Sequence, residues 1–185
     1  RPPREAIPLD VSGLSDSDFV VENATTELGL IALPGAAGLG AISGTVTGEA
    51  VAGTFVVAGG ATAIADADGS FTIFNVPEGS VSVQAYRLDA NYAAETVDVE
   101  AGATTDGVVL AASGEATAVV SGDINLVNPG DGDLTSVILV VADTFDDTTL
   151  TGEAPPGFRV GDVGNAWSIA GVPDGDYVVL AAFEN

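Results

Sequence analysis

A strand-turn-strand motif occurs twice in this chain, and the repeat limits the possible folds more than any other feature. Residues 71–83 read Phe-Thr-Ile-Phe-Asn-Val-Pro-Glu-Gly-Ser-Val-Ser-Val, and residues 167–179 read Trp-Ser-Ile-Ala-Gly-Val-Pro-Asp-Gly-Asp-Tyr-Val-Val. In both copies apolar and polar residues alternate around a Pro-x-Gly turn, which is the pattern of two β-strands joined by a bend. Because Pro77 and Pro173 lie 96 residues apart, the repeat predicts two similar β-domains in tandem.

The composition agrees with this prediction. The chain has 185 residues, of which 46% are hydrophobic, and this is enough for a core in each of two small domains. Val and Thr, which favour strands, are frequent, and the 24 Gly residues suit frequent turns. We therefore predict an all-β fold with two tandem antiparallel β-sandwiches, preceded by an extended N-terminal arm.

The repeat also sets the expected boundaries. Residues 1–40 form the N-terminal arm, either a linker or an ordered segment with a candidate strand, residues 41–113 the first β-sandwich, and residues 114–185 the second. The Ile-Ser-Gly motif at residues 42–44 returns as Val-Ser-Gly at residues 120–122, an offset of 78 rather than 96, so the second copy contains 18 additional residues. Two strands that end the first copy have no counterpart before the end of the sequence, and we expect the second sandwich to lack its last strands.

The motifs at residues 42–44, 66–73 and 76–79 resemble the carboxypeptidase regulatory-like domain, a transthyretin-like (prealbumin-like) sandwich with immunoglobulin-like architecture that is related to collagen-adhesin B-type repeats. The resemblance covers residues 41–112 and, in part, residues 117–185. It implies a spacer, stalk or adhesive module of a secreted or cell-surface protein. The Lys–Asn or Lys–Asp isopeptide crosslink of collagen-adhesin repeats is excluded, because all four basic residues of this chain are Arg, and the family's zinc carboxypeptidase domain is missing.

The charge is strongly negative and excludes several classes of partner. Asp and Glu number 27 against four basic residues, a formal net charge of −23. Such a surface repels nucleic acid and anionic lipid, and it attracts cations. The sequence also contains no run of ~18 apolar residues that would predict a membrane-spanning helix.

Calcium is the one cofactor that the acidic residues suggest. Asp66-x-Asp68-Gly69 resembles the start of an EF-hand loop, but its twelfth position is Pro77 instead of Glu, so a β-turn is favoured. Five further carboxylates lie in or beside the insertion of the second copy and would repel one another unless they bound a cation. These candidate Ca²⁺ ligands are Asp131, Asp133, Asp143, Asp146 and Asp147.

Catalysis is not expected. A nucleophile needs a partner base, and the chain contains no His, Lys or Cys. Phe71 and Trp167 occupy equivalent positions on alternating strands and are predicted to be core residues. Tyr86, Tyr92 and Tyr177 are predicted to pack at strand ends with hydrated hydroxyl groups. A carbohydrate-binding module is the alternative function, and it requires a strip of exposed aromatic side chains.

The arm and the incomplete second sandwich together suggest assembly. An apolar segment of the arm can add a strand to an open sheet edge of another copy, and head-to-tail addition that does not close yields a filament. The alternative is a piece of a longer surface protein. In both cases we predict a non-catalytic extracellular or cell-surface structural module whose partners are other protein chains, including copies of itself. The candidate pairing residues are Phe19, Val20, Val21, Leu28, Leu30 and Ile31.

Overall fold

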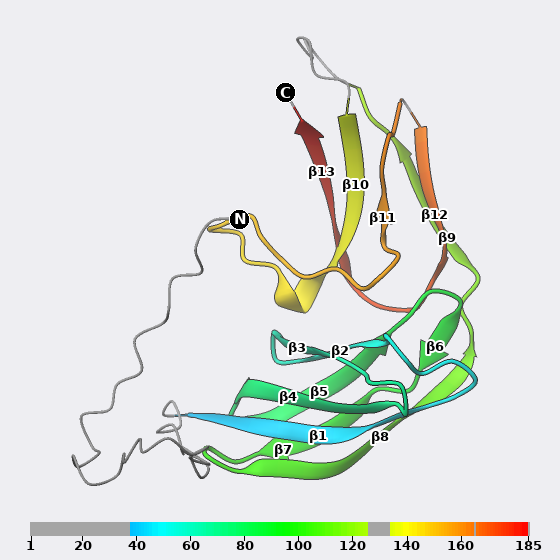
Figure 1. Ribbon diagram of the computed structural model, residues 1–185. Helices are drawn as coiled ribbons and strands as arrows, with labels where there is room; N and C mark the ends of the chain where they lie inside the picture. The colour runs from blue at the N-terminus through cyan, green and yellow to red at the C-terminus, as the bar shows by residue number, and fades with distance from the viewer. Residues whose placement is uncertain (1–37, 126–133, 165, 185) are drawn as a thin grey trace, which may run out of the picture. The chain divides into compact units, whose positions relative to one another are not determined.

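The computed structural model describes residues 38–125, 134–164 and 166–184 (Figure 1). The chain divides into two compact units, Arg1–Pro34 and Gly35–Asn185, and the described residues belong to the second. In the described residues all regular elements are β-strands except a three-residue 3-10 turn, η1 (Ala142–Thr144). The fold class is therefore all-β, as the sequence predicts. No helix among these residues is long and apolar enough to cross a membrane.

The first sandwich consists of two four-stranded sheets, with the strand orders β4-β1-β8-β6 and β3-β2-β5-β7. A single hydrophobic cluster of residues from both sheets lies between them. The strands are β1 (Leu39–Thr47), β2 (Phe55–Ala58), β3 (Ala61–Ile64), β4 (Ser70–Pro77), β5 (Gly79–Tyr86), β6 (Ala90–Tyr92), β7 (Glu95–Val99) and β8 (Thr104–Glu115).

Alternation along the strands places the core residues. On β4, Phe71 and Ile73 are buried, whereas Thr72 and Phe74 are exposed. Such a period of two lets one face of a strand meet the opposite sheet while the other remains in water. The side chains that are fully buried in this way, and that form the centre of the first sandwich, are Ile42, Val56, Ile73, Val76, Val83 and Leu110.

One pairing differs from the antiparallel prediction, because β1 and β8 are parallel. The loop that follows β7 crosses to the other sheet and lies beside the start of β1, where Ala41 N–H donates to the Ala103 carbonyl at 2.9 Å and Gly102 N–H to that of Leu39 at 2.8 Å. Because β8 starts at the same end as β1, the two strands run in the same direction. The segment 92–99 contributes to two strands that belong to different sheets, β6 and β7.

The second sandwich consists of the sheets β12-β9 and β11-β10-β13. Its core cluster contains Leu139, Phe158, Ile169 and Val172, which come from both sheets and from the segment before β11. The predicted domain boundaries at residues 40 and 113 stay predictions. The strands are β9 (Ala118–Asp123), β10 (Leu134–Val141), β11 (Arg159–Val160), β12 (Ala166–Val172) and β13 (Tyr177–Glu184).

The two sandwiches repeat the same pairing register. Ile42 of β1 lies opposite Ile73 of β4, and Val120 of β9 lies opposite Ile169 of β12. In both cases the Pro-x-Gly segment after β4 or β12 leads to a strand of the other sheet, β5 or β13. The repeated motif is therefore a corner between two sheets in both copies, and the two strands that it joins do not pair with each other.

A glycine faces an aromatic ring at the centre of each β1-type strand. Gly44 pairs with Phe71, and Gly122 pairs with Trp167. A Cβ atom at Gly44 would lie 2.8 Å from Phe71 Cζ and 2.9 Å from Val108 Cβ, and it would also meet the backbone carbonyl of Val108. Gly44 therefore allows both the ring and the backbone of β8 to approach β1 closely.

We predict that Gly44→Ala lowers the free energy of unfolding by about 3 kcal/mol, because an added methyl group must displace the backbone of β8. Chemical denaturation followed by circular dichroism measures this loss. Gly114→Ala is the matched control, since a Cβ atom at Gly114 of β8 meets nothing within 4 Å, and its effect should stay within about 1 kcal/mol. Equal stability of the two variants would contradict the close packing of β1 against β8.

Candidate functional site

The predicted calcium ligands that lie in the described residues, Asp143, Asp146 and Asp147, form no metal-binding group of three. Asp143 is part of η1, and Asp146 and Asp147 follow it in a short loop closed by the bridge between Asp146 and Thr151. Asp131 and Asp133 lie outside the described residues, so a calcium site that includes them stays a prediction. Among the described residues, no group of three or more His, Cys, Asp or Glu side chains could hold a metal ion.

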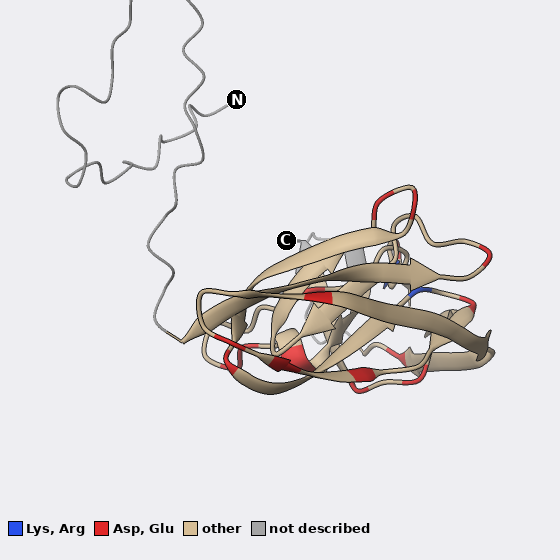
Figure 2. Cartoon of the chain, turned by 90° about the horizontal axis from the view of Figure 1, so that it is seen from below, with Lys and Arg blue, Asp and Glu red and all other residues tan. Residues whose placement is uncertain are grey.

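The carboxylate of Asp146 serves its own loop. Its Oδ1 accepts a hydrogen bond from the Thr148 backbone N–H at 2.8 Å. This bond, together with a hydrogen bond from the Thr149 side chain, lowers the pKa of Asp146 because both stabilise the charged form. Acids also appear as separate red segments on strands and loops in Figure 2.

The segment 66–70 is a β-turn, as the sequence predicts. Gly69 N–H donates to the Asp66 carbonyl at 3.0 Å, and Gly69 has a φ of +84°, which favours glycine. Asp68 accepts hydrogen bonds from the side chain of Ser70 at 2.6 Å and from its backbone N–H at 3.0 Å. These two bonds lower the pKa of Asp68.

The candidate pairing residues of the arm, from Phe19 to Ile31, lie outside the described residues. The strand edges of the second sandwich with which these residues would pair do lie in the described residues. β1 lies between β4 and β8, and β5 lies between β2 and β7. Their counterparts β9 and β13 have one neighbour each within the described part of the chain, β12 and β10 respectively. Within the described residues, β9 and β13 are therefore open strand edges, whereas their counterparts in the first sandwich are paired on both sides.

The open edges leave core positions uncovered. Val83 of β5 has no exposed surface, whereas Val179, its counterpart on β13, is 49% exposed. Ile42 of β1 is fully buried, whereas its counterpart Val120 on β9 is half-buried. Because these pairs occupy the same register positions, we attribute the difference in exposure to the second flanking strand, which β1 and β5 have and which β9 and β13 lack in the described residues.

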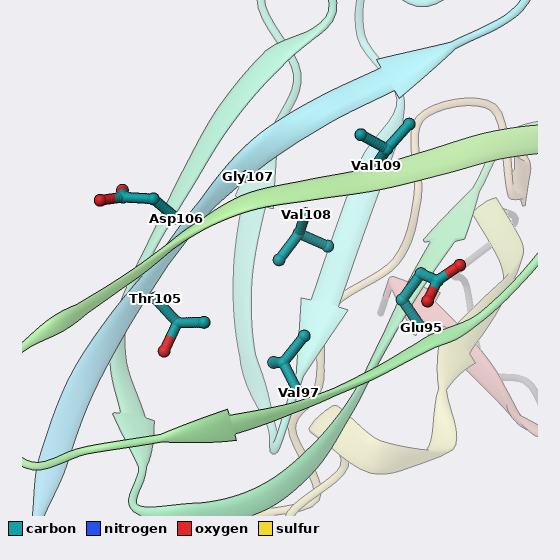
Figure 3. A pocket seen from close by; sticks show the side chains of 7 residues that line it. All are labelled: Glu95, Val97, Thr105, Asp106, Gly107, Val108 and Val109. Carbon is teal, nitrogen blue, oxygen red and sulfur yellow. The ribbon is translucent and has the colours of Figure 1, made fainter.

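In the first sandwich β7 and β8 close this side of the core (Figure 3). Val97 of β7 and Val108 of β8 point toward one another across the gap between the strands, and Asp106 points away from it. Thr105 Oγ1 of β8 donates to the Asp98 carbonyl of β7 at 3.0 Å. The hollow between the two strands measures about 320 Å³.

The first and second sandwiches are joined by an aromatic contact inside the unit Gly35–Asn185. The rings of Tyr86 and Tyr177 meet edge to face, with their centroids 5.9 Å apart. Phe55, Val57 and Val141 belong to the same buried cluster, and we call these five residues the joint. The Tyr177 O–H donates to the Pro173 carbonyl at 3.0 Å, a contact that the sequence did not predict.

Backbone groups of the repeated corner strengthen the joint. Asp174 N–H, directly after Pro173, donates to Asn91 Oδ1 at 2.8 Å, and Asp89 N–H donates to the Gly171 carbonyl at 2.7 Å. Sequence reasoning missed Phe55 and Val57 as joint residues. A signal exists, since all four residues of β2 are buried, and a continuous apolar run is typical of a strand that is covered on both faces.

Aromatic side chains form no exposed strip in the described residues. Phe74 is 66% exposed and is the one large exposed aromatic there, whereas Phe71 is buried and Trp167 is half-buried against the second core. The prediction of Phe71 as a core residue is confirmed, and that of Trp167 is confirmed in part.

Comparisons with solved structures yield several likenesses, including the two that follow. No protein family profile and no curated protein sequence matches the chain. It is similar to the crystal structure of a DUF3823 family protein from Parabacteroides merdae, with 16% identity, a TM-score of 0.30, and coverage of 80% of this chain and 82% of that one. It is also similar to the Bacillus anthracis TIE protein, with 11% identity, a TM-score of 0.32, and coverage of 79% of this chain and 31% of that one. At these scores neither likeness assigns a family or an activity.

The joint makes the free energy of unfolding depend on pH in the alkaline range. Burial, with smaller contributions from Asp143 and Asp176, raises the pKa of Tyr86 from 10.0 to about 12. Burial also raises the pKa of Tyr177, with contributions from Tyr86 and Asp174. The unfolded chain therefore releases these protons at lower pH than the folded chain, and the free energy of unfolding falls as the pH rises from 10 to 12.

We predict that Tyr86→Phe weakens this pH dependence, because the variant lacks one of the protons that the folded state retains. Urea unfolding midpoints between pH 10 and pH 12, with neutral pH as the control condition, measure it. If Tyr86→Phe has the same alkaline slope as the unchanged chain, Tyr86 does not hold its proton in the folded state.

Proposed function

We propose that this chain is a non-catalytic structural module of a secreted or cell-surface protein and that it assembles through the open edges of its second sandwich. The observation that carries the proposal is the exposure of Val179 at a position that is completely buried in the first sandwich. An unpaired strand edge beside exposed core residues is a template for an additional strand. Strand addition satisfies the free backbone groups and covers the apolar surface in one step.

The joint supports a spacer role. Its buried aromatic contact, the hydrogen bond from Asp174 N–H to the Asn91 side chain and that from Asp89 N–H to the Gly171 carbonyl connect the successive sandwiches in addition to the short segment between β8 and β9. A linked pair of sandwiches suits a stalk or a filament subunit, because force along the chain passes through packed side chains as well as through the backbone. The acidic surface, with its net charge of −23, keeps such a module soluble.

The chemistry of the side chains supports a non-catalytic role. The sequence has no His, Cys or Lys to act as a general base or nucleophile. Calcium binding and carbohydrate binding are the alternatives from the sequence. The described residues favour neither, since they contain no metal-binding group of three acids and no strip of exposed aromatics.

Self-association tests the proposal. We predict that the unchanged chain associates in a concentration-dependent way in analytical ultracentrifugation, and that Val179→Lys lowers the association constant at least tenfold. The reason is that an added strand would bury the charge of an inward-facing lysine against the apolar core, which disfavours pairing. Thr72→Lys is the matched control, because Thr72 is an exposed strand residue of the first sandwich, and this change should leave association unaltered.

A chain that stays monomeric at high concentration, or equal association of the two lysine variants, would contradict assembly through this edge. Circular dichroism of both variants checks that each sandwich is intact.

A further inference from the structure

The segment before the first sandwich resembles the segment that ends it. Residues 97–111, which include the end of β7 and most of β8, read Val-Asp-Val-Glu-Ala-Gly-Ala-Thr-Thr-Asp-Gly-Val-Val-Leu-Ala. Residues 19–32 read Phe-Val-Val-Glu-Asn-Ala-Thr-Thr-Glu-Leu-Gly-Leu-Ile-Ala. Both contain Val-Glu, then a Thr-Thr-acid triplet, then an apolar run that ends in Ala, and the loop before Thr-Thr differs by one residue.

The spacing to the next strand agrees as well. From Thr105 to Ser121 of the Val-Ser-Gly motif there are 16 positions, and from Thr26 to Ser43 of the Ile-Ser-Gly motif there are 17. A segment of β7–β8 type therefore precedes a β1-type strand twice. The arm has the sequence of the last two strands of a sandwich, and these are the strands whose counterparts flank neither β9 nor β13 in the described structure.

We propose that residues 19–32 of one copy supply the β7-type and β8-type strands of the second sandwich of another copy. This proposal rests on the proposed function, because it names the partner of the open edges. The β8-type part, from Thr25 onward, lies parallel to β9, and the β7-type part, from Phe19 to Val21, lies along β13.

Gly122 keeps the space that this strand requires. At Gly44 the backbone of β8 approaches so closely that a Cβ atom would meet the carbonyl of Val108. At Gly122 the three atoms nearest to such a Cβ all belong to Trp167 of β12, at 3.1–3.2 Å, and none belongs to a strand on the other side of β9. An alanine would fit there with a small shift of the ring. The lack of a side chain therefore matters most when a β8-type strand lies beside β9.

The side chains of the arm match the β7 positions more closely than the β8 positions. Phe19 and Val21 correspond to Val97 and Val99, the two residues of β7 that pack on the first core. In the β8-type part, Leu28 stands where Gly107 has a φ of +81° beside a register irregularity in the β1–β8 pairing. A leucine disfavours that conformation, so we expect the arm to pair with β9 without the irregularity.

The order of the chain places the arm before β1 in the same way as β8 stands before β9. The sandwich that β8 completes precedes β9 in the chain, and only residues 116 and 117 separate the two strands. By the same order, the sandwich that the arm completes precedes β1. The acceptor in this proposal is the second sandwich of another copy, because β9 and β13 each have one neighbouring strand in the described residues. Repetition of this contact gives a head-to-tail filament.

Disulfide trapping tests the partner and the register together, since the chain has no Cys of its own. In the first sandwich Thr104 pairs with Ala41, and the corresponding positions are Thr25 of the arm and Val119 of β9. One full-length chain carries Thr25→Cys, and a second, size-tagged chain carries Val119→Cys. We predict an intermolecular disulfide between them under mild oxidation, at raised salt because both partners are acidic.

Matched variants give the expected contrasts. Replacing Val119→Cys by Thr72→Cys should reduce the mixed disulfide at least tenfold, because Thr72 is exposed in the first sandwich. Adding Gly122→Ala to the Val119→Cys chain should reduce it to a similar extent. Adding Gly161→Ala instead should leave the yield of the mixed disulfide unchanged, since a Cβ atom at Gly161 meets nothing within 4 Å.

Equal trapping at Thr72 and Val119, or no effect of Gly122→Ala, would overturn the proposal. A third chain carries both Thr25→Cys and Val119→Cys, and a disulfide that forms only within this chain would overturn the proposal as well. If trapping fails while the association that Val179→Lys weakens persists, the proposed function stands and the arm is not the partner. If the chain shows neither intermolecular trapping nor self-association, both proposals are wrong.

Discussion

Each core strand of this fold depends on neighbours on both of its sides. In the first sandwich β1 lies between β4 and β8, β5 lies between β2 and β7, and the inward residues Ile42 and Val83 at their centres are fully buried. Backbone pairing and apolar burial are coupled here, because the strand that accepts the hydrogen bonds also covers the core. The second sandwich repeats the register on one side of β9 and β13 and leaves the other side free in the described residues.

Two glycine–aromatic crossings hold the repeated register. Phe71 covers Gly44, and Trp167 covers Gly122, so a ring replaces the side chain that the glycine lacks. At Gly44 the same position also accommodates β8. Gly44 therefore allows both the close packing of β1 with β4 and the close approach of β8. A glycine at the equivalent position 122 leaves the same space beside β9, although only the Trp167 ring approaches Gly122.

The sequence predicts the parts of this structure that depend on local patterns. Alternation identified Phe71 as an inward residue, and the Pro-x-Gly repeat identified the corners at Pro77 and Pro173. The parallel direction of β8 could not be predicted in this way, because a period of two reports which face is buried but not which strand lies alongside. The joint was missed for a related reason, since the buried run of β2 does not reveal that Tyr177 covers it.

Hydrogen–deuterium exchange resolved to individual strands tests the account most directly. Amides of β1 and β5 lie inside their sheets and should be protected in the dissociated chain. The account predicts that β9 and β13 exchange faster than β1 and β5 in dilute solution and gain protection when the concentration is raised, whereas protection of β1 and β5 changes little. Protection of β9 and β13 that is already equal to that of β1 and β5 in the dilute chain, or that does not depend on concentration, would contradict it.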